Sequence, residues 1–326
     1  MKAGSRGSVL ILAMWSLFFL AALAIAIGSY VSAGLMLASH IQGRVRIEAV
    51  ARAGVDRAIM EIMCRATNGW DGMQADAWNR RADAFSGVLP GGSFEVVWTA
   101  IAADGKPVSS GGVIGEERNI NINMASEKVL AALFVRARIE GDVETLAKAV
   151  VSRRDMAGAP LTDETETDYD ARRAKPYGAV AELLMVPGMS AEALGRLQPL
   201  LTAYGSGKIN VNAADTVVLA SLADGTGAGT VQARDSLARK IAVFRETGRR
   251  FVEPTVNALV GELSDFSVLT PGEVEVFTAM MPELAIGSTC FGGNAVAKHA
   301  SERGEERRIE FVFDVPRRCM LAWMEY

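Results

Sequence analysis

The chain has 326 residues, of which 50% are hydrophobic and 22% are charged, and its formal net charge is −4. This length allows two domains of ordinary size beyond a membrane segment, and the slightly acidic balance does not favour a nucleic-acid-binding surface. Its two histidines, His40 and His299, lie in no recognisable catalytic context. Because a Ser-His-Asp or Cys-His set would need one of them, we expect no enzymatic activity.

The first forty residues carry the clearest signal. Arg6 and Gly7 precede an uncharged, mostly apolar run from Ser8 to Ser39, which is longer than the roughly 20 residues that a helix needs to cross a bilayer. Lys2 and Arg6 lie before this run and the next basic residue is Arg44. The distribution of positive charge therefore predicts a single span with a cytoplasmic N-terminus and the rest of the chain outside.

A candidate cleavage site lies before the apolar run, between Gly7 and Ser8. A secretory signal peptide would instead show a shorter apolar stretch followed by a small-residue site. A short basic leader that ends in glycine, ahead of an intact helix, is what a prepilin-type peptidase recognises. We interpret residues 1–7 as such a leader, with a plain signal anchor as the alternative.

The helix is predicted to continue well beyond the membrane run. Apolar residues recur at helical spacing from Ile47 to Met63, and no proline occurs in residues 1–89. One helix from about Ser8 to about Arg65 would then have an amphipathic second half that packs on a globular domain. We expect Val50 and Ala58 to lie on a part of this half that contacts partner subunits, because uncovered apolar residues need burial.

Strands are predicted on both sides of a long, mostly helical interval. Their positions are Ser93–Ile101, part of Val113–Ile122, Arg308–Asp314 and, after a turn, Cys319–Met324. They predict one antiparallel sheet packed on the long helix, an α+β layer arrangement. The expected division is a leader (1–7), a transmembrane segment (8–39), the first part of the sheet domain (40–118), an inserted all-α domain (119–283) and the C-terminal strands (284–326).

The helical interval contains an internal repeat. Ile120–Leu133 aligns with Ile209–Leu222, and both segments begin Ile-Asn-x-Asn and continue Val-Leu-x-x-Leu. Asn123 and Asn212 are predicted N-caps of the helices that follow. We favour duplication of a helical module over two helix starts that are alike by chance.

A hairpin of two helices is predicted between the two repeats. Pro187 and Gly188 would form its tight turn, and Ser190 would cap the next helix. DNA-binding hairpins of this type end in a second glycine, so that backbone N–H groups can meet a phosphate. Here Ser190 takes that place without a cluster of Lys or Arg, so we favour a structural hairpin over a DNA-binding one.

Together these motifs resemble one family, general secretion pathway protein K, the K-type minor pseudopilins of type II secretion systems. The hairpin with Pro199–Gly205 and Lys208–Asn212 carries the resemblance, and the leader, the Asn121–Asn123 segment and the Leu321–Trp323 ending also fit. The resemblance spans nearly the whole chain. The chain departs from the family at Ala213, in the segment 150–155 and over residues 284–305.

The resemblance implies a pilin-like body with an inserted α domain and a non-enzymatic role. The subunit would lie in the bacterial inner membrane, with its globular part in the periplasm, after cleavage and methylation by a prepilin peptidase. It would occupy the tip of the pseudopilus, start assembly with I- and J-type minor pseudopilins, and assist the export of secreted protein substrates. A minor pilin of a type IV pilus or a DNA-uptake machine is the alternative.

Leu12 would be the fifth residue of the mature chain. Most pilins place a glutamate there, which meets the amino terminus of a neighbouring subunit in the membrane. A subunit without this carboxylate suits the top of a filament, where an unpaired carboxylate in lipid would be costly.

Two further features leave alternatives open. An acidic loop has the oxygen-rich composition that Ca²⁺ prefers, and K-type relatives bind calcium, although a solvated loop is the alternative; its residues are Asp163, Glu164, Glu166, Asp168 and Asp170. Cys290 and Cys319 could pair in an oxidising periplasm, although free thiols are the preferred reading.

Overall fold

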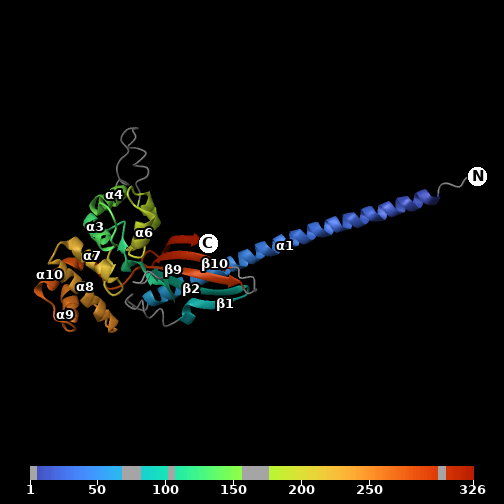
Figure 1. Ribbon diagram of the computed structural model, residues 1–326. Coiled ribbons are helices and arrows are strands. Elements are labelled where there is room, and N and C mark those ends of the chain that lie inside the picture. The colour runs from blue at the N-terminus through green and yellow to red at the C-terminus, as the bar shows by residue number, and fades with distance from the viewer. Residues whose placement is uncertain (1–5, 68–81, 102–106, 156–175, 300–305) are drawn as a thin grey trace, which may run out of the picture.

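The computed structural model describes residues 6–67, 82–101, 107–155, 176–299 and 306–326 (Figure 1). A single helix, α1 (Arg6–Thr67), extends far beyond the rest of the molecule, as Figure 1 shows. Its 62 residues correspond to roughly 90 Å at 1.5 Å per residue. The expectation of one continuous helix is confirmed.

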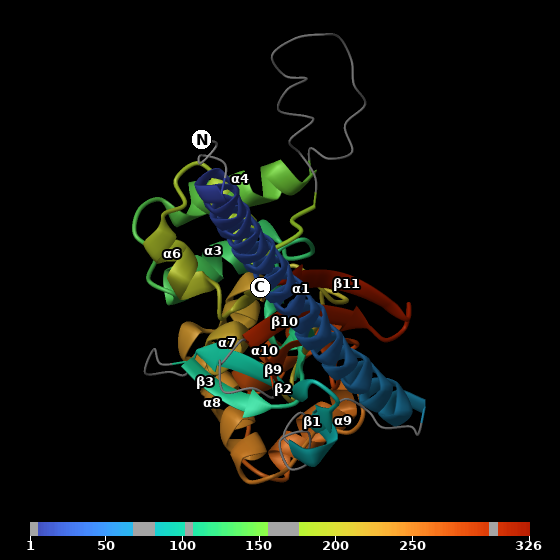
Figure 2. The ribbon, with the colours of Figure 1, turned by 90° about the vertical axis from the view of Figure 1, so that its right-hand side faces the viewer.

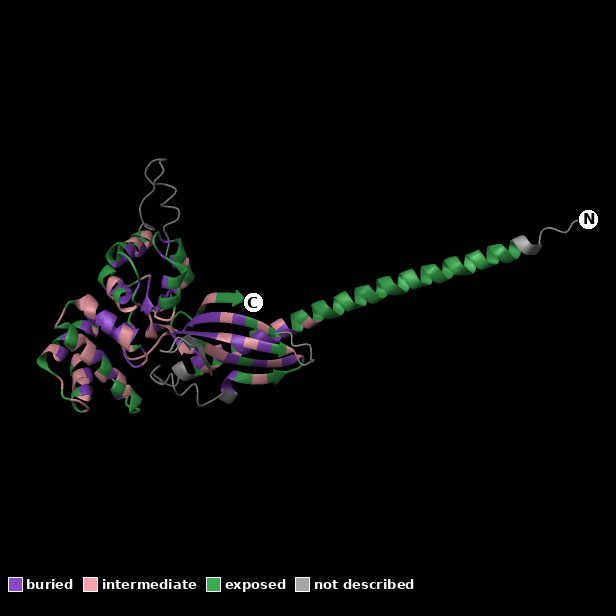
Figure 3. Ribbon diagram, viewed as in Figure 1, coloured by how far each residue is buried: buried purple, intermediate pink, exposed green. Residues whose placement is uncertain are grey.

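The two halves of α1 have different surroundings. The first half projects from the globular part, and its apolar side chains are exposed along their whole length (Figure 3). The second half packs on the sheet, and Ile47, Ala51 and Val55 are fully buried there. Gly54 allows this close approach, because a Cβ atom at that position would lie 3.1 Å from the ring of Phe94.

The sheet is antiparallel and has the strand order β1-β2-β9-β10-β11, with β3 and β4 paired beside it. Its strands are β1 (Ser86–Leu89), β2 (Gly92–Ile101), β3 (Pro107–Gly111), β4 (Ile114–Gly115), β9 (Cys290–His299), β10 (Glu306–Asp314) and β11 (Cys319–Glu325). Seen along α1, the helix crosses the sheet and β11 lies at its edge (Figure 2). The long helix on an antiparallel sheet, together with a helical region, gives an α+β, pilin-like arrangement.

A central strand of this sheet, β9, was not predicted from the sequence. Its segment contains Gly292 and Gly293 and lacks the alternation of a half-buried strand. The small residues are needed there, since a side chain at Gly292 would collide with the carboxylate of Glu116 and one at Gly293 would press on Phe311. Burial on both faces therefore hides the strand from periodicity.

A large insertion connects β4 to β9. Its helices are α3 (Glu127–Arg136), α4 (Val143–Asp155), α6 (Ala191–Leu197), α7 (Thr216–Thr226), α8 (Val231–Glu246), α9 (Val256–Ser264) and α10 (Pro271–Met280), with the 3₁₀ turns η2 (Glu116–Arg118), η4 (Val180–Met185) and η5 (Met281–Glu283). A further 3₁₀ turn, η1 (Ala82–Phe85), precedes β1 and lies outside the insertion. The helices of the insertion are packed around one another. They form a hydrophobic core of their own, separate from the core between α1 and the sheet.

The insertion is not purely α-helical, which corrects the expected all-α domain. Two short parallel ladders hold its ends together, β5 (Ile120–Asn121) with β6 (Leu201–Thr202) and β7 (Ile209–Asn210) with β8 (Leu284–Ala285). Each Ile-Asn repeat forms the first strand of one ladder, and the chain returns after several helices to form the second. The insertion therefore consists of two modules with the same plan, as expected for a duplication.

The N-caps that we predicted for the repeated helices are wrong by three residues. Ser126 caps α3 and Asp215 caps α7, each accepting a backbone N–H of the first turn. Asn123 and Asn212 lie too far before the helices to cap them. Their side chains instead cross-link distant loops within each module. Ser190 does cap α6, where its hydroxyl accepts the N–H of Ala193 at 3.0 Å.

Candidate functional site

The first half of α1 is a long, exposed apolar surface. The helical segment Val9–Cys64 has the length and hydropathy of a membrane span, and its most apolar window is wholly exposed. Leu12 lies on this surface with 70% of its area exposed, while Gly7 and Ser8 lie in the first turns of the helix. One long apolar helix near the N-terminus is compatible with a single membrane span or with a signal sequence.

The second half of α1 offers a different surface from the one we expected. Val50 and Ala58 are 3% and 0% exposed and belong to the core against the sheet, so the expectation that they face a partner is wrong. The apolar residues that do lie open on this half are Val45 and Met60, with 60% and 55% of their area exposed. The sequence predicted that a sheet packs on this half of the helix, but the helical spacing could not tell which of its apolar residues the sheet covers.

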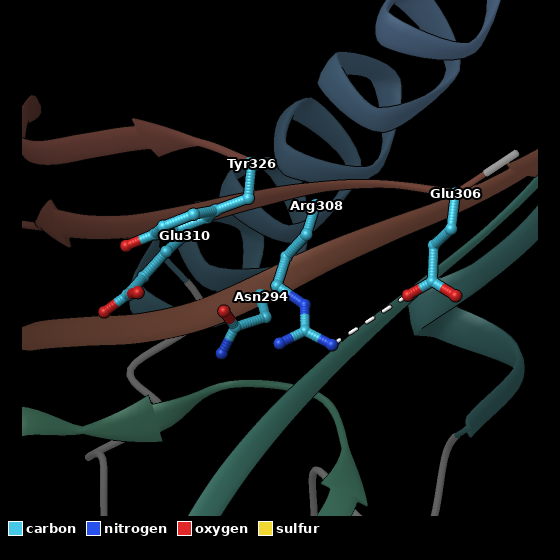
Figure 4. A pocket seen from close by; sticks show the side chains of 5 residues that line it. All are labelled: Asn294, Glu306, Arg308, Glu310 and Tyr326. Carbon is cyan, nitrogen blue, oxygen red and sulfur yellow. Dashed lines mark ion pairs between the residues drawn. The ribbon is translucent and has the colours of Figure 1, made fainter.

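The face of the sheet opposite α1 is polar. Asn294, Arg308 and Glu310 project from β9 and β10 beside Glu306 and Tyr326, and together they line a hollow of about 480 Å³ (Figure 4). The one ion pair drawn there joins Arg308 to Glu306 at 3.9 Å. Glu310 is half-buried, whereas Glu306 and Arg308 are exposed, and it forms no ion pair within the described residues.

A larger cleft of about 570 Å³ lies between this face and the first module of the insertion. Glu310 and Tyr326 belong to both hollows, so the two spaces adjoin. The opposite wall comes from the η4 and α6 region, with Val180 and Gln198, and from Tyr204 after β6. The cleft is therefore lined by the sheet, by the edge strand β11 and by the insertion.

Two adjacent glutamates lie in η2, where the insertion begins, and the first of them, Glu116, lines the cleft. The carboxylate of Glu117 accepts the backbone N–H groups of Ser206, Thr289 and Cys290, as well as the hydroxyl of Thr289. These donors lie between the two modules and at the return to the sheet. Glu117 therefore holds together the segments through which the insertion leaves and re-enters the sheet domain.

Glu116 has a different environment. Burial, together with the nearby charge of Glu117, raises the pKa of Glu116 to about 7, although the hydroxyl of Thr202, which donates to it at 2.6 Å, opposes the shift. Sequence reasoning missed both glutamates, because a Glu-Glu pair usually indicates a solvated surface. The signal that could have found them is their position within a predicted strand region, shortly before the repeated Ile-Asn segment.

The predicted hairpin turn is present, and hydrogen-bond donors of the helix that follows it bond other groups of the same chain. Gly188 adopts φ +90°, a left-handed conformation that favours glycine, and it follows Pro187 after η4. The guanidinium of Arg196 on α6 bonds the carbonyl of Arg138 and the carboxylate of Glu192. This geometry supports a structural role for the hairpin.

The acidic loop lies outside the described residues, so its predicted ligands cannot be placed: Asp163, Glu164, Glu166, Asp168 and Asp170. In the part of the chain that the structure does describe, no group of three or more His, Cys, Asp or Glu side chains is arranged to hold a metal ion.

Cys290 and Cys319 form no disulfide in the structure. Cys290 on β9 and Cys319 on β11 both lie opposite Asp314 on the strand between them. Two strand spacings, about 9.5 Å, separate their Cα atoms, and this exceeds the reach of a disulfide. The pairing of these two cysteines is therefore excluded by the register of the sheet.

Comparison with known proteins assigns neither a family nor a function to the chain. No model of a known protein family matches the chain. No curated protein matches it either.

Proposed function

We propose that this protein is a minor pseudopilin of the K type, a non-enzymatic subunit of a type II secretion system. The observation that carries the proposal is the division of α1. A bare apolar half suits the inner membrane, while the other half forms the core of an antiparallel sheet domain in the periplasm. The resemblance of the hairpin and the Asn-x-Asn segments to K-type proteins supports the same function.

The proposed place of the subunit is the tip of the pseudopilus. The insertion adds two helical modules to one end of the sheet domain (Figure 1), and this bulk would obstruct a thin filament if every subunit carried it. Leu12 offers no carboxylate to a neighbour above. A single copy at the end, starting assembly with I- and J-type minor pseudopilins, satisfies both conditions.

The hairpin supports a secretion assembly over a type IV pilus or a DNA-uptake machine. A phosphate-binding hairpin needs free backbone N–H groups at the helix start, and here the hydroxyl of Ser190 accepts one of them. Arg196, the basic residue of α6, is held by Glu192 at 2.7 Å. We therefore do not propose nucleic acid as a partner.

The proposal extends to the acidic loop, for which we infer Ca²⁺ as the ligand. Its basis is the carboxylate-rich sequence between Asp163 and Asp170 and the resemblance to K-type proteins. A hard divalent cation takes several oxygen ligands at once, and bound Ca²⁺ would join residues that otherwise repel each other.

Co-purification of the full chain in detergent with I- and J-type pseudopilins from the same organism tests the proposed function. We expect a discrete complex with one copy of this chain, measured by light scattering. Val45→Glu should weaken the complex, because it places a charge on the exposed apolar part of α1, whereas the similarly sized Val45→Thr should bind nearly as well. A homopolymer of this chain, or no affinity for any other pseudopilin, contradicts the proposal.

A further inference from the structure

The two edges of the sheet differ in how they are protected. At one edge β1 has 4 residues and β3 has 5, and β3 begins with Pro107. At the other edge β11 has 7 residues, pairs with β10 alone, and carries no proline or lysine. Because natural edge strands are usually kept short or charged, the long β11 edge requires an explanation.

The backbone of β11 has hydrogen-bonding groups that point away from the sheet. Arg308 and Tyr326 exchange both of their backbone hydrogen bonds, at 3.2 and 2.9 Å. Alternate residues of an antiparallel strand turn these groups to opposite sides. The N–H and C=O groups of Trp323 and Glu325 therefore point outward, where the described residues place no other strand.

The side chains along most of this edge are apolar and accessible, and the charged Glu325 at its end pairs with Arg52 of α1 at 3.2 Å. The residues from Met320 to Met324 are uncharged and none of them is buried, while Trp323 and Met324 are 39% and 36% exposed. Trp323 lies opposite Phe311 and so shares the α1 side of the sheet, whereas Met324 lies opposite Glu310 on the cleft side. An added strand would place one row of side chains beside α1 and the other row in the cleft.

The cleft provides room for that second row. Its volume of about 570 Å³ lies directly beside Met324 and Tyr326, and Glu310 has no ionic partner there among the described residues. Free backbone groups at strand spacing are satisfied by an extended chain and not by a helix, whose own backbone groups are already paired. The adjoining cleft and edge thus match an extended segment with apolar residues and a basic side chain opposite Glu310.

We propose that β11 accepts an extended segment of another minor pseudopilin, which pairs with the backbone of Trp323 and Glu325 and directs a Lys or Arg side chain toward Glu310. This inference rests on the proposed function, because it takes the partner from the same tip assembly. It adds the site of contact and the chemistry of the segment that binds there.

Amide hydrogen exchange of the full chain in detergent, alone and with co-purified I- and J-type pseudopilins, tests the pairing directly. In the free chain the outward amides of Trp323 and Glu325 should exchange quickly. In the complex we expect their exchange to slow by at least about tenfold. A complex that forms while both amides keep their free rates overturns the inference and leaves the proposed function standing.

Substitution separates backbone pairing from side-chain packing. Trp323→Pro removes an N–H that the β10–β11 ladder does not use, and proline is tolerated at such edge positions. It should weaken binding by about tenfold, whereas Trp323→Thr keeps the N–H and should bind more tightly than the proline variant. Equal binding by both variants contradicts the pairing. If no pseudopilin binds even the unmodified chain, the proposed function and this inference both fail.

Discussion

Asn123 and Asn212 make the same three hydrogen bonds in the two modules of the insertion. The amide of Asn123 donates to the carbonyls of Tyr177 and Ala203 and accepts the N–H of Tyr177, at 2.8–3.0 Å. Asn212 donates to the carbonyls of Phe251 and Ile286 and accepts the N–H of Phe251, each at 2.9 Å.

A second pair of residues repeats in the same way. Arg154 donates to the carbonyls of Ile122 and Ala125. Arg245 donates to those of Val211 and Ala214, the matching positions of the second repeat. The loop after each Ile-Asn strand is thus held by one asparagine and one arginine. This shared bonding pattern is stronger support for duplication than the similarity of the two sequences.

Replacing Asn212 should destabilise the second module. Asn212→Ala leaves the N–H of Phe251 and two carbonyls without partners in a buried site, which should cost about 3 kcal/mol of unfolding free energy. Thermal unfolding of the purified chain, followed by circular dichroism, measures the loss. Asn257→Ala on the exposed side of α9 is the matched control and should change stability by less than about 0.5 kcal/mol. Equal melting temperatures for both variants would show that the bonds of Asn212 are not needed.

The stability of the protein should fall as pH rises from about 4.5 to 7. The folded-state pKa of Glu116 is raised to about 7, mainly by burial, so the folded protein holds this proton more tightly than the unfolded chain does. The stabilising contribution is complete below the unfolded pKa and is lost as pH rises through the folded one. The expected loss is on the order of 3 kcal/mol.

Glu116→Gln isolates this effect, because an uncharged amide of the same shape can still accept the hydroxyl of Thr202. Between pH 4.5 and 8 the melting temperature should depend less on pH for the variant than for the unmodified chain. Glu273, whose pKa is also shifted, does not titrate in this pH range. Its burial favours the neutral acid, but hydrogen bonds that include one from Lys240 outweigh this and lower its pKa to about 2. The contribution of Glu273 is therefore lost only as pH falls from about 4.5 toward 2. An unchanged slope in Glu116→Gln would assign the pH dependence to other groups.

Much of the fold could be predicted from the sequence, because its strongest patterns are local. The uninterrupted apolar run and helical spacing located α1, and the alternation of residues 308–314 located β10. The patterns that failed depend on tertiary contacts. Burial on both faces concealed β9, and the helical spacing did not indicate that the predicted sheet would cover Val50 and Ala58. The role of Glu117 was equally hidden, since its donors lie in Ser206, Thr289 and Cys290, far along the chain.

Calcium should stabilise the protein if the acidic loop binds it. Adding Ca²⁺ to the chelator-treated chain should raise its melting temperature, because a ligand that binds only the folded state stabilises it by an amount that grows with the ligand concentration relative to its Kd. Replacing Asp168 and Asp170 together with Asn should remove this increment while leaving the melting temperature in chelator nearly unchanged. Mg²⁺ at the same concentration is the control for a general ionic effect. If the unmodified chain melts at the same temperature with and without Ca²⁺, the acidic loop is a solvated loop that does not bind the ion.

Processing of the N-terminus separates a pseudopilin from a protein with an ordinary signal sequence. The peptidase should cut between Gly7 and Ser8, so N-terminal sequencing of the membrane-purified protein should begin at Ser8, with a methylated amine detected by mass spectrometry. Gly7→Val should block cleavage, because a β-branched side chain would crowd a site that fits glycine, and the uncut chain should keep Lys2 and Arg6. Ser5→Val, a change of similar bulk two residues earlier in the leader, is the control and should still be cut. A mature chain that begins after about residue 20, as removal of a signal peptide would leave it, would overturn the pseudopilin proposal, because the membrane half of α1 would then be lost.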